Sequence, residues 1–564
     1  MIIITTKRSD ETERRLREGD FSLSSDVRLH KHEQFTCFAG GGFKVQHIGD
    51  STIFHTGRAV CSGKEVKPDE YREPVDLAED LKMAIGYFTF LLVESTRVTI
   101  ISSLYRHIDI FYVAAGDEIV VSSDLSALLA IVGTRRINAS FVSEFVNEDC
   151  FFRGDTLFEG VGHVPLGEAL VLQRRAAARR EAWNVPKPRR VDFIEELRSN
   201  IRRFAADEER VFVQFSGGLD SSLILHIAKE IFPNCVALHL LSLDDAASEI
   251  DTARQVAAEF GVELRIHESP IRFAAARSSF AMASRINSPF DVYPLSPDPA
   301  DRNFAYDEQI RAVGIDGGCF LTGQGGDYVF LQNPPPHVGL DGYRDGGLRG
   351  FIEAVKAYSQ LKKVPFFRLL RHNIEAAILG VRPGSILTPA KIGHCRTASP
   401  SRPHALLSEL PVQSPKFAHI QSVLTGLYQL RPNDGNQFRV IHPLFMQNIL
   451  AGVLGEPVHR MFTADYDRIQ IRRAFAQSSA SQAAWRRTKR PSSGLVFSFF
   501  RNNEELVKCF LRRGIVASTI GIEDKWINDI VTENANIVTT GEAGLVLNML
   551  RLEMFAQAYS KHIA

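Results

Sequence analysis

The chain has 564 residues, of which 45% are hydrophobic and 23% are charged, and its 66 basic residues equal its 66 acidic residues. This length allows two or more domains, and the balanced charge gives no general attraction to nucleic acid or membrane surfaces. The longest apolar stretches are far shorter than a bilayer span, and the N-terminus lacks the features of a secretory signal peptide. The seven cysteines are scattered without a CxxC pair, which indicates reduced thiols in a cytoplasmic protein rather than disulfides or a zinc site.

Residues 1–185 have the pattern of a β-rich domain. Short apolar and β-branched runs, several of them separated by Gly, Asp or Asn turns, predict strands at 52–54, 87–93, 98–101, 110–114 and 118–122. A short helix is expected after Asp124, at residues 125–131. The segment 181–190 contains two prolines and three basic residues, so we interpret it as the linker to a second domain at 190–564.

Residues 211–232 predict a strand, a tight polar loop and a helix. The loop reads Ser216-Gly217-Gly218-Leu219-Asp220-Ser221-Ser222. Its glycines allow the backbone to approach an anion closely, and its hydroxyls and the free amides of the helix start can donate to that anion. Asp220 would repel phosphate unless a divalent cation lay between them. No lysine follows the glycines, unlike the GxxxxGK[ST] loop, and the alternative is a serine-rich turn in an ordinary βα unit.

A second glycine-rich turn, Thr322-Gly323-Gln324-Gly325-Gly326-Asp327, also follows an apolar run. Between the two turns, the sequence predicts a strand at 235–240, a helix at 248–261 and a strand at 264–267, an alternation that favours a doubly wound parallel sheet. Turns at the ends of parallel strands can face each other, so Asp220 and Asp327 could share one Mg²⁺ bound to a triphosphate. A plain β-turn that uses glycine for positive φ is the alternative.

The first loop resembles the pyrophosphate loop (PP-loop) of enzymes that split ATP into AMP and pyrophosphate, and the order of segments resembles asparagine synthetase B. Residues 86–90 resemble that family's G-x-F-A-F strand, and 104–112 and 121–125 resemble its R-D-x-x-G-x-x-P-L-Y-Y and F-A-S-E-x-K-A-L segments. The resemblance implies an α/β protein: a β-rich, Ntn-hydrolase-like glutaminase domain, then a PP-loop ATP pyrophosphatase domain with a doubly wound parallel sheet and a helical substrate region.

That family's glutaminase uses a cysteine directly after the initiator Met, because the α-amine acts as its base. Ile2 occupies this position, so we expect a domain that keeps the fold and has lost glutamine hydrolysis. The alternative is that Cys37 or Cys61 is a relocated nucleophile.

The same resemblance implies the residues of the ATP site. The end of the 235–240 strand would frame the adenine with backbone groups of His239 and Leu240, while the His239 imidazole is more simply a buried strand histidine. The implied nucleotide-binding set is Ser216, Gly217, Gly218, Asp220, Ser221, Ser222, Leu240, Thr322 and Gly323, with Mg²⁺ held by Asp220 and Asp327. Gln324 departs from the family, because asparagine synthetase has Glu and β-lactam synthetase has Tyr there.

The remaining 225 or so residues predict helices at 348–359, 367–379, 418–430 and 545–559, and a mobile loop near the substrate at 391–415. Residues 438–445 resemble the family's R-x-P-F-L-D turn, and 466–475 its K-x-x-L-R-x-A-F helix. The segment from Trp485 to Lys489 resembles W-R-x-K, which implies that Lys489 stabilises charge on the α-phosphate and the reacting carbonyl. We interpret Arg486, Arg487 and Arg490 as phosphate or peptide contacts; a solvated basic face is the alternative.

Over nearly its full length the chain resembles the lasso peptide cyclases, the C proteins of microcin-type gene clusters. The most particular strings are 323–330 followed by 332–334, then 341–345, and 489–493. The resemblance implies ATP·Mg²⁺-dependent adenylation of an Asp or Glu side chain in a precursor lasso peptide. The N-terminal amine of that peptide then attacks to form an isopeptide bond, as a step in antibiotic biosynthesis. The implied partners are the precursor peptide and a leader peptidase, the B protein. Another amide ligase, ammonia-dependent or β-lactam-forming, and a non-catalytic scaffold are the alternatives.

Overall fold

The computed structural model describes the chain except for residues 8, 19–26, 32–33, 41, 148–149, 151, 243–249, 270–274, 283–285, 301–316, 380–401, 431–437, 488–492 and 537–539.

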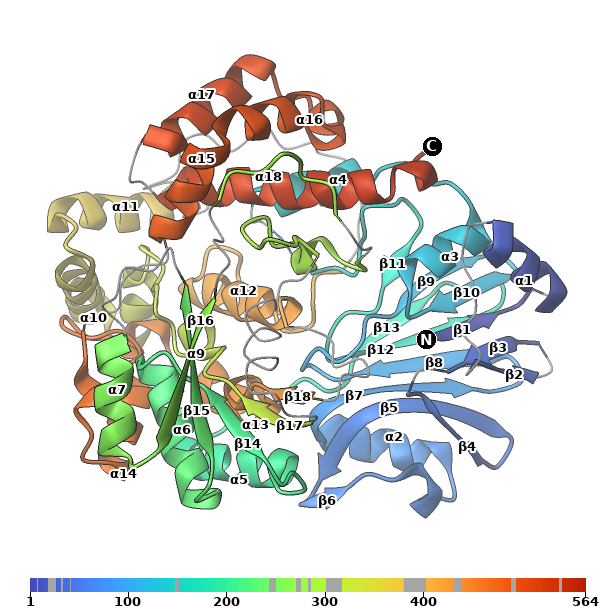
Figure 1. The fold of residues 1–564 in the computed structure, drawn as a ribbon, viewed down its shortest axis with the longest axis horizontal. Coiled ribbons are helices and arrows are strands. Elements are labelled where there is room, and N and C mark those ends of the chain that lie inside the picture. The colour runs from blue at the N-terminus through green and yellow to red at the C-terminus, as the bar shows by residue number, and fades with distance from the viewer. Residues whose placement is uncertain are drawn as a thin grey trace.

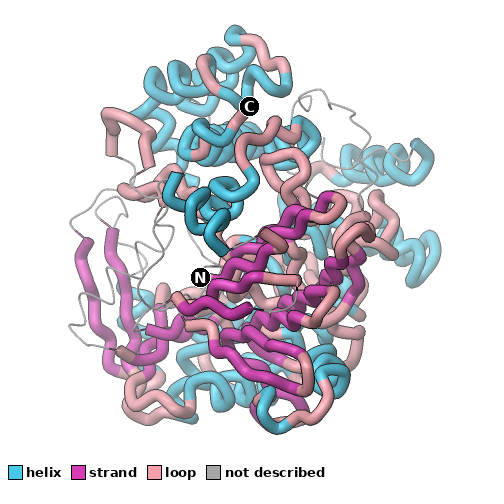
Figure 2. The backbone as a smooth tube through the Cα atoms, turned by 90° about the vertical axis from the view of Figure 1, so that its right-hand side faces the viewer, coloured by secondary structure: helices cyan, strands magenta, loops and turns pink. Residues whose placement is uncertain are grey.

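The N-terminal part contains two antiparallel sheets that pack face to face (Figures 1 and 2). Apolar side chains of both sheets, such as Ile4 and Leu91, share one core. The first sheet, in the order β11-β9-β10-β1-β3-β2, consists of β1 Ile2–Thr5, β2 Arg28–Lys31, β3 Thr36–Ala39, β9 Phe111–Ala115, β10 Glu118–Ser122 and β11 Gly162–His163. The second, in the order β13-β12-β8-β7-β5-β4 with β6 beside β5, consists of β4 Lys44–Ile48, β5 Ser51–Cys61, β6 Lys64–Glu65, β7 Ile85–Val93, β8 Arg97–Ser102, β12 Glu168–Gln173 and β13 Arg179–Ala182.

The helices of this part are α1 Ser9–Glu18, α2 Pro74–Met83, α3 Leu125–Val132 and α4 Ala139–Val146. Asp124 caps α3, because its carboxylate accepts a hydrogen bond from the Ala127 amide. The expected linker is held tightly at Asn184, whose side-chain amide donates to the Leu81 and Ala84 carbonyls. The segment that joins the two parts therefore packs against the first of them.

The C-terminal part is built on a five-stranded parallel sheet in the order β16-β15-β14-β17-β18. Its strands are β14 Val211–Gln214, β15 Val236–Ser242, β16 Glu263–Ser269, β17 Gly318–Leu321 and β18 Phe438–Ile441. Side chains alternate across it: Val213 joins the main core with α5 and α6, and Phe212 packs with Leu238 and Phe320 on the other face. Successive strands add outward from β14 until the order reverses at β17. The boundary between β14 and β17 is therefore the point where open α/β sheets bind ligands.

Helices complete the C-terminal part: α5 Phe193–Ala205, α6 Leu219–Ile231, α7 Ile250–Glu259, α9 Gly326–Val329, α10 Gly339–Lys362, α11 Phe366–Leu379, α12 Pro415–Tyr428, α13 Gln447–Leu454, α14 Ile469–Ser478, α15 Ser493–Arg512, α16 Ile515–Ile520, α17 Asp524–Asn536 and α18 Thr540–Ala558. Gly346 and Gly347 interrupt α10 with non-helical backbone angles, so the expected helix from 348 is its second half. Long α18 lies beside α4 of the N-terminal part (Figure 1), and the two share an apolar core.

This architecture confirms the predicted α/β class, with a β-rich first part and a parallel sheet with helices in the second. The predicted strands and helices of both parts are present with shifted ends. Of the loop expected to be mobile, 391–401 lie outside the described residues. Within the described part, His404 is buried and bonds through Nε2 to the Leu166 carbonyl at 2.7 Å. Among the helices of the described residues, none is long and apolar enough to cross a membrane.

Candidate active site

The two glycine-rich turns touch each other at the boundary between β14 and β17. A Cβ atom on Gly323 would lie 2.6 Å from the Ser221 amide nitrogen, and one on Gly326 would lie 2.1 Å from Oδ1 of Asp220. Only glycine tolerates such contacts, so the glycines of the second turn let it pack directly onto the first. The structure therefore confirms the expectation that the two turns face each other.

The serine-rich loop is held by its own hydroxyl groups. Ser216 and Ser221 share a hydrogen bond between their Oγ atoms at 3.2 Å, and the Gly218 amide donates to Ser216 Oγ at 3.2 Å. Gly217 has φ +79°, and a Cβ there would lie 2.9 Å from the backbone nitrogen of Ala253 on α7. The loop is therefore a narrow backbone turn at the start of α6, a position whose amide groups favour anions.

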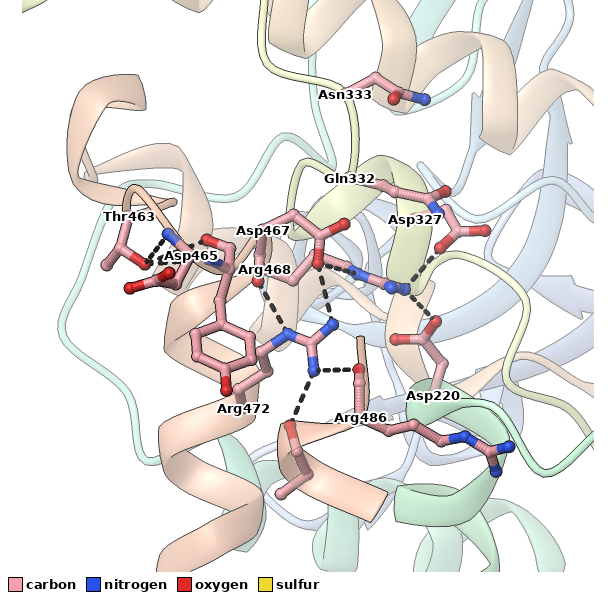
Figure 3. Close-up of polar contacts among 12 residues, drawn as sticks. Asp220, Asp327, Gln332, Asn333, Thr463, Asp465, Asp467, Arg468, Arg472 and Arg486 are labelled. Atoms are coloured by element: carbon pink, nitrogen blue, oxygen red, sulfur yellow. Dashed lines mark hydrogen bonds and ion pairs between the residues drawn. The ribbon is translucent and has the colours of Figure 1, made fainter. Parts of the chain in front are cut away.

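Asp220 and Asp327 converge on one nitrogen atom of Arg468 (Figure 3). Nη1 of Arg468 lies 2.6 Å from Oδ2 of Asp220 and 2.5 Å from Oδ1 of Asp327. Burial alone would lower the pKa of Arg468, but the carboxylates, Asp220 first, outweigh it and raise this pKa above its usual value. In the amide orientation that satisfies both groups, Gln332 donates to both oxygens of Asp327, at 3.0 and 3.2 Å. The two acidic groups thus lie within reach of one shared cation.

A second buried arginine supports this arrangement. Arg472 binds the Asp467 carboxylate at 3.0 Å and donates to the carbonyls of Ala484 at 2.8 Å and Arg486 at 3.0 Å. It thereby ties α14 to the segment that follows Trp485. The Arg486 guanidinium reaches the Thr252 hydroxyl on α7, beside Gly217. Arg486 is therefore a cation at the serine-rich loop.

The neighbouring strand ends place buried polar side chains and Leu240 beside the two turns. His239 is buried and its Nδ1 lies 2.8 Å from the Phe215 carbonyl, which confirms the expectation of a satisfied strand histidine. Leu240 is half-buried on β15, which runs beyond the end of β14. Thr322 is fully buried and bonds to Nδ1 of His442 at 2.6 Å, so it fixes β17 to the residue after β18. Ser222 is also fully buried.

The basic segment after Trp485 is described only in part. Lys489 and Arg490 lie outside the described residues, and so the role implied for Lys489 stays a prediction. Arg487 is exposed, binds Asp465 at 3.0 Å and lies over the Tyr466 ring, 4.6 Å from its centroid. In this arrangement Arg487 points to a surface pair rather than to the two acidic turns.

The residues considered as glutaminase nucleophiles are buried or apolar. Ile2 lies in β1 between β10 and β3, with a fully buried side chain. Burial raises the pKa of the Cys37 thiol to about 12, which disfavours the thiolate that a nucleophile needs. Cys61 is half-buried at the end of β5.

Arg468 was not singled out by the sequence reasoning. A signal existed, because the resemblance of 466–475 to K-x-x-L-R-x-A-F puts Arg468 at the lysine and Arg472 at the arginine. Both were interpreted only as part of a basic helix. Gln332 belongs to one of the particular strings that carried the resemblance, and the structure gives it a contact with Asp327.

Comparisons with known proteins agree with this geometry. Residues 193–371 match the asparagine synthase family model. The chain is 26% identical to the microcin J25-processing protein McjC of Escherichia coli, over 93% of this chain and 96% of that protein. Together these similarities support a lasso peptide cyclase of the asparagine synthetase superfamily. They also support an ATP-dependent ligase.

Two solved structures are also similar. The glutamine phosphoribosylpyrophosphate amidotransferase of B. subtilis is 10% identical, with 58% of this chain and 77% of that chain covered and a TM-score of 0.21. A structure described as the allosteric regulatory enzyme of purine biosynthesis is 12% identical, with 51% and 76% covered and a TM-score of 0.19. Scores this low do not establish a shared fold.

The residues of the two turns fit a magnesium–nucleotide complex. Glycine at position 217 lets the first turn pack closely against α7, because a Cβ there would collide with that helix. Mg²⁺ in nucleotide sites is held by one or two carboxylates together with phosphate oxygens, and Asp220 and Asp327 form such a pair. Among the described residues no group of three or more His, Cys, Asp and Glu side chains could hold a metal by themselves.

Proposed function

We propose that this protein is an ATP-dependent lasso peptide macrocyclase. The observation that carries the proposal is the convergence of Asp220 and Asp327 on one point between β14 and β17. The near-full-length similarity to a microcin J25-processing protein supports a peptide as the substrate. The chain is proposed to work with the precursor peptide and a leader peptidase that exposes the amine of that peptide.

The proposed reaction has two steps. The side-chain carboxylate of an Asp or Glu in the peptide attacks the α-phosphorus of ATP, so that pyrophosphate leaves and an acyl-adenylate forms. The N-terminal amine of the same peptide then attacks the acyl carbon, AMP leaves with the bonding electron pair, and the amine loses a proton. The product is an isopeptide bond, and the folded peptide gains rate from proximity because both groups belong to one molecule.

The residues of the site divide these tasks. The serine-rich loop, from Ser216 to Ser222, would hold the phosphates with its backbone amides and hydroxyls. Asp220 and Asp327 would hold Mg²⁺, which supplies charge neutralisation for the departing pyrophosphate. Thr322 and Gly323 would line the nucleotide from the second turn, and Leu240 would lie by the adenine.

Charge develops on the α-phosphate and on the acyl oxygen in both steps. Lys489 is proposed to stabilise it, and Arg486, which reaches Thr252 beside the serine-rich loop, is proposed to assist. Water must be kept out, because it would hydrolyse the adenylate. The N-terminal part, with Ile2 buried in β1, is proposed to serve as a structural wall rather than as a glutaminase.

The test is pyrophosphate release from ATP with and without the cognate linear peptide. The proposal expects release that depends on peptide, AMP as the other product, and a peptide that has lost the mass of one water. Asp220→Ala should abolish release, while Asp251→Ala, which removes an acid with an 80% exposed side chain on α7, should not. ADP formation, or release that needs ammonia instead of peptide, would reject a macrocyclase in favour of another reaction.

A further inference from the structure

Arg468 occupies the position between the acidic turns from which a metal would bind both. The nitrogen that joins the two carboxylates lies 2.6 Å from one oxygen and 2.5 Å from the other, so these oxygens are at most about 5 Å apart. Mg²⁺ binds oxygen at about 2.0–2.1 Å, which places two of its ligands about 3–4 Å apart. A small approach of the two acids would let one ion bind both, but only in the volume that Nη1 fills.

We infer that Arg468 and the divalent cation are alternative partners of Asp220 and Asp327, and that Arg468 is the residue that sets how readily the site accepts the metal. This inference rests on the proposed function of the two turns as the magnesium–nucleotide site. A guanidinium and Mg²⁺ repel each other, so both cannot lie between the same two oxygens. The metal can bind the carboxylates of Asp220 and Asp327 only after Nη1 of Arg468 has moved away from them.

Burial, an ion pair and the backbone conformation hold Arg468 in this position. Its side chain is 4% exposed, and its Nε binds Asp467 at 3.3 Å. Its backbone has φ 51° and ψ 38°, a left-handed conformation that residues other than glycine rarely adopt. Strained backbone of this kind persists where the surroundings fix it, and it concentrates at functional sites.

The charge balance explains why metal bound to ATP can displace Arg468. Arg468 brings one positive charge to the two carboxylates that it joins. A divalent cation balances both carboxylates and also brings phosphate oxygens as ligands. A bare cation must compete with Arg468 without that help. Arg468 thus favours entry of the metal together with the nucleotide.

The experiment measures binding of Mn²⁺ alone, by electron paramagnetic resonance, with no ATP or peptide present. Arg468→Gln removes the competing charge, and we expect it to bind one Mn²⁺ at least tenfold more tightly than the wild-type chain. Arg468→Lys, which cannot offer the same planar fork, should lie between them and provides a second variant should the first fold poorly. Adding Asp220→Asn to Arg468→Gln should remove the gain.

Arg473→Gln is the control, because it removes one positive charge from an exposed position on α14, the helix that Arg468 precedes. It should leave Mn²⁺ affinity unchanged. Thermal unfolding gives a second readout: Mn²⁺ should raise the melting temperature of Arg468→Gln but not that of Arg473→Gln. Equal Mn²⁺ affinity in the wild-type chain and both Arg468 variants would overturn the inference. Since no peptide is used, a failure of peptide-dependent AMP formation would reject the proposed function without altering this result.

Discussion

Gly326→Ala should disable the site without changing any polar residue. An alanine Cβ at this position would lie 2.1 Å from Oδ1 and 2.2 Å from Cγ of Asp220. Non-bonded carbon atoms are most stable at about 3.5–4.0 Å, so the Asp220 carboxylate would have to retreat by more than about 1 Å. The opposite oxygen of that carboxylate is 2.6 Å from Arg468, and a retreat of this size is enough to break the contact.

Two magnitudes follow from this displacement. Overpacking of a well-packed interior costs about 1–3 kcal/mol, so the variant should still fold but unfold at a lower denaturant concentration. Misplacing one of two proposed metal ligands should cost about 3 kcal/mol of transition-state stabilisation, which is about a 100-fold loss of rate. The loss of activity should therefore be far larger than the loss of folded protein.

The assay is peptide-dependent pyrophosphate release, with circular dichroism to confirm the folded state. Gly346→Ala is the matched control, because a Cβ there meets no atom within 4 Å. It should keep the wild-type rate within about twofold. If Gly326→Ala retained the wild-type rate, the contact between the two turns would have no bearing on catalysis, and the reasoning would be wrong.

Three further outcomes are expected. Arg106 is fully buried between two carboxylates, so Arg106→Met should lower the free energy of unfolding, measured in urea, by about 3–5 kcal/mol. Arg175→Met, which removes an exposed ion pair, should not shift the urea midpoint. Similar midpoints for both variants would contradict this. Burial lowers the pKa of His107 to about 4, so its contribution to stability is complete above pH 6.5 and is lost as pH falls toward 4. His107→Gln should make this acid loss of stability shallower. An unchanged pH profile of stability would refute the role given to His107. Iodoacetamide at pH 8 should label Cys509, which is exposed, well before Cys37, as read by mass spectrometry, and early labelling of Cys37 would restore it as a candidate nucleophile.

The sequence predicted what depends on local pattern. Strands such as β7 and β10 have apolar runs bounded by turns. The loops at 216–222 and 322–327 combine glycines with an aspartate directly after an apolar run, a pattern typical of a nucleotide-binding turn. The meeting of Asp220 and Asp327 could be expected because both follow parallel strands. That they hold Mg²⁺ stays a prediction, as do the domain boundaries and the role of Lys489.

What the sequence did not predict depends on contacts between distant segments. Arg468, just before α14, reaches Asp220 across 248 positions, and the motif that contains it does not indicate this contact. At Ile2 the sequence showed only that the glutaminase cysteine is missing. The structure shows that Ile2 begins β1, which pairs with β10 and β3. The prolines of 181–190 predicted a linker, but not that Asn184 within it is anchored by carbonyl groups about a hundred positions away.

The shared core of α4 and α18 has a consequence for folding during translation. Leu128 and Phe145 of the N-terminal part pack in one apolar cluster with Leu550 and Phe555, more than 400 positions later. These early side chains cannot find their final neighbours until almost the whole polypeptide has been translated. The nascent chain must therefore carry an uncovered apolar face through most of synthesis, which is the situation in which chaperones are needed.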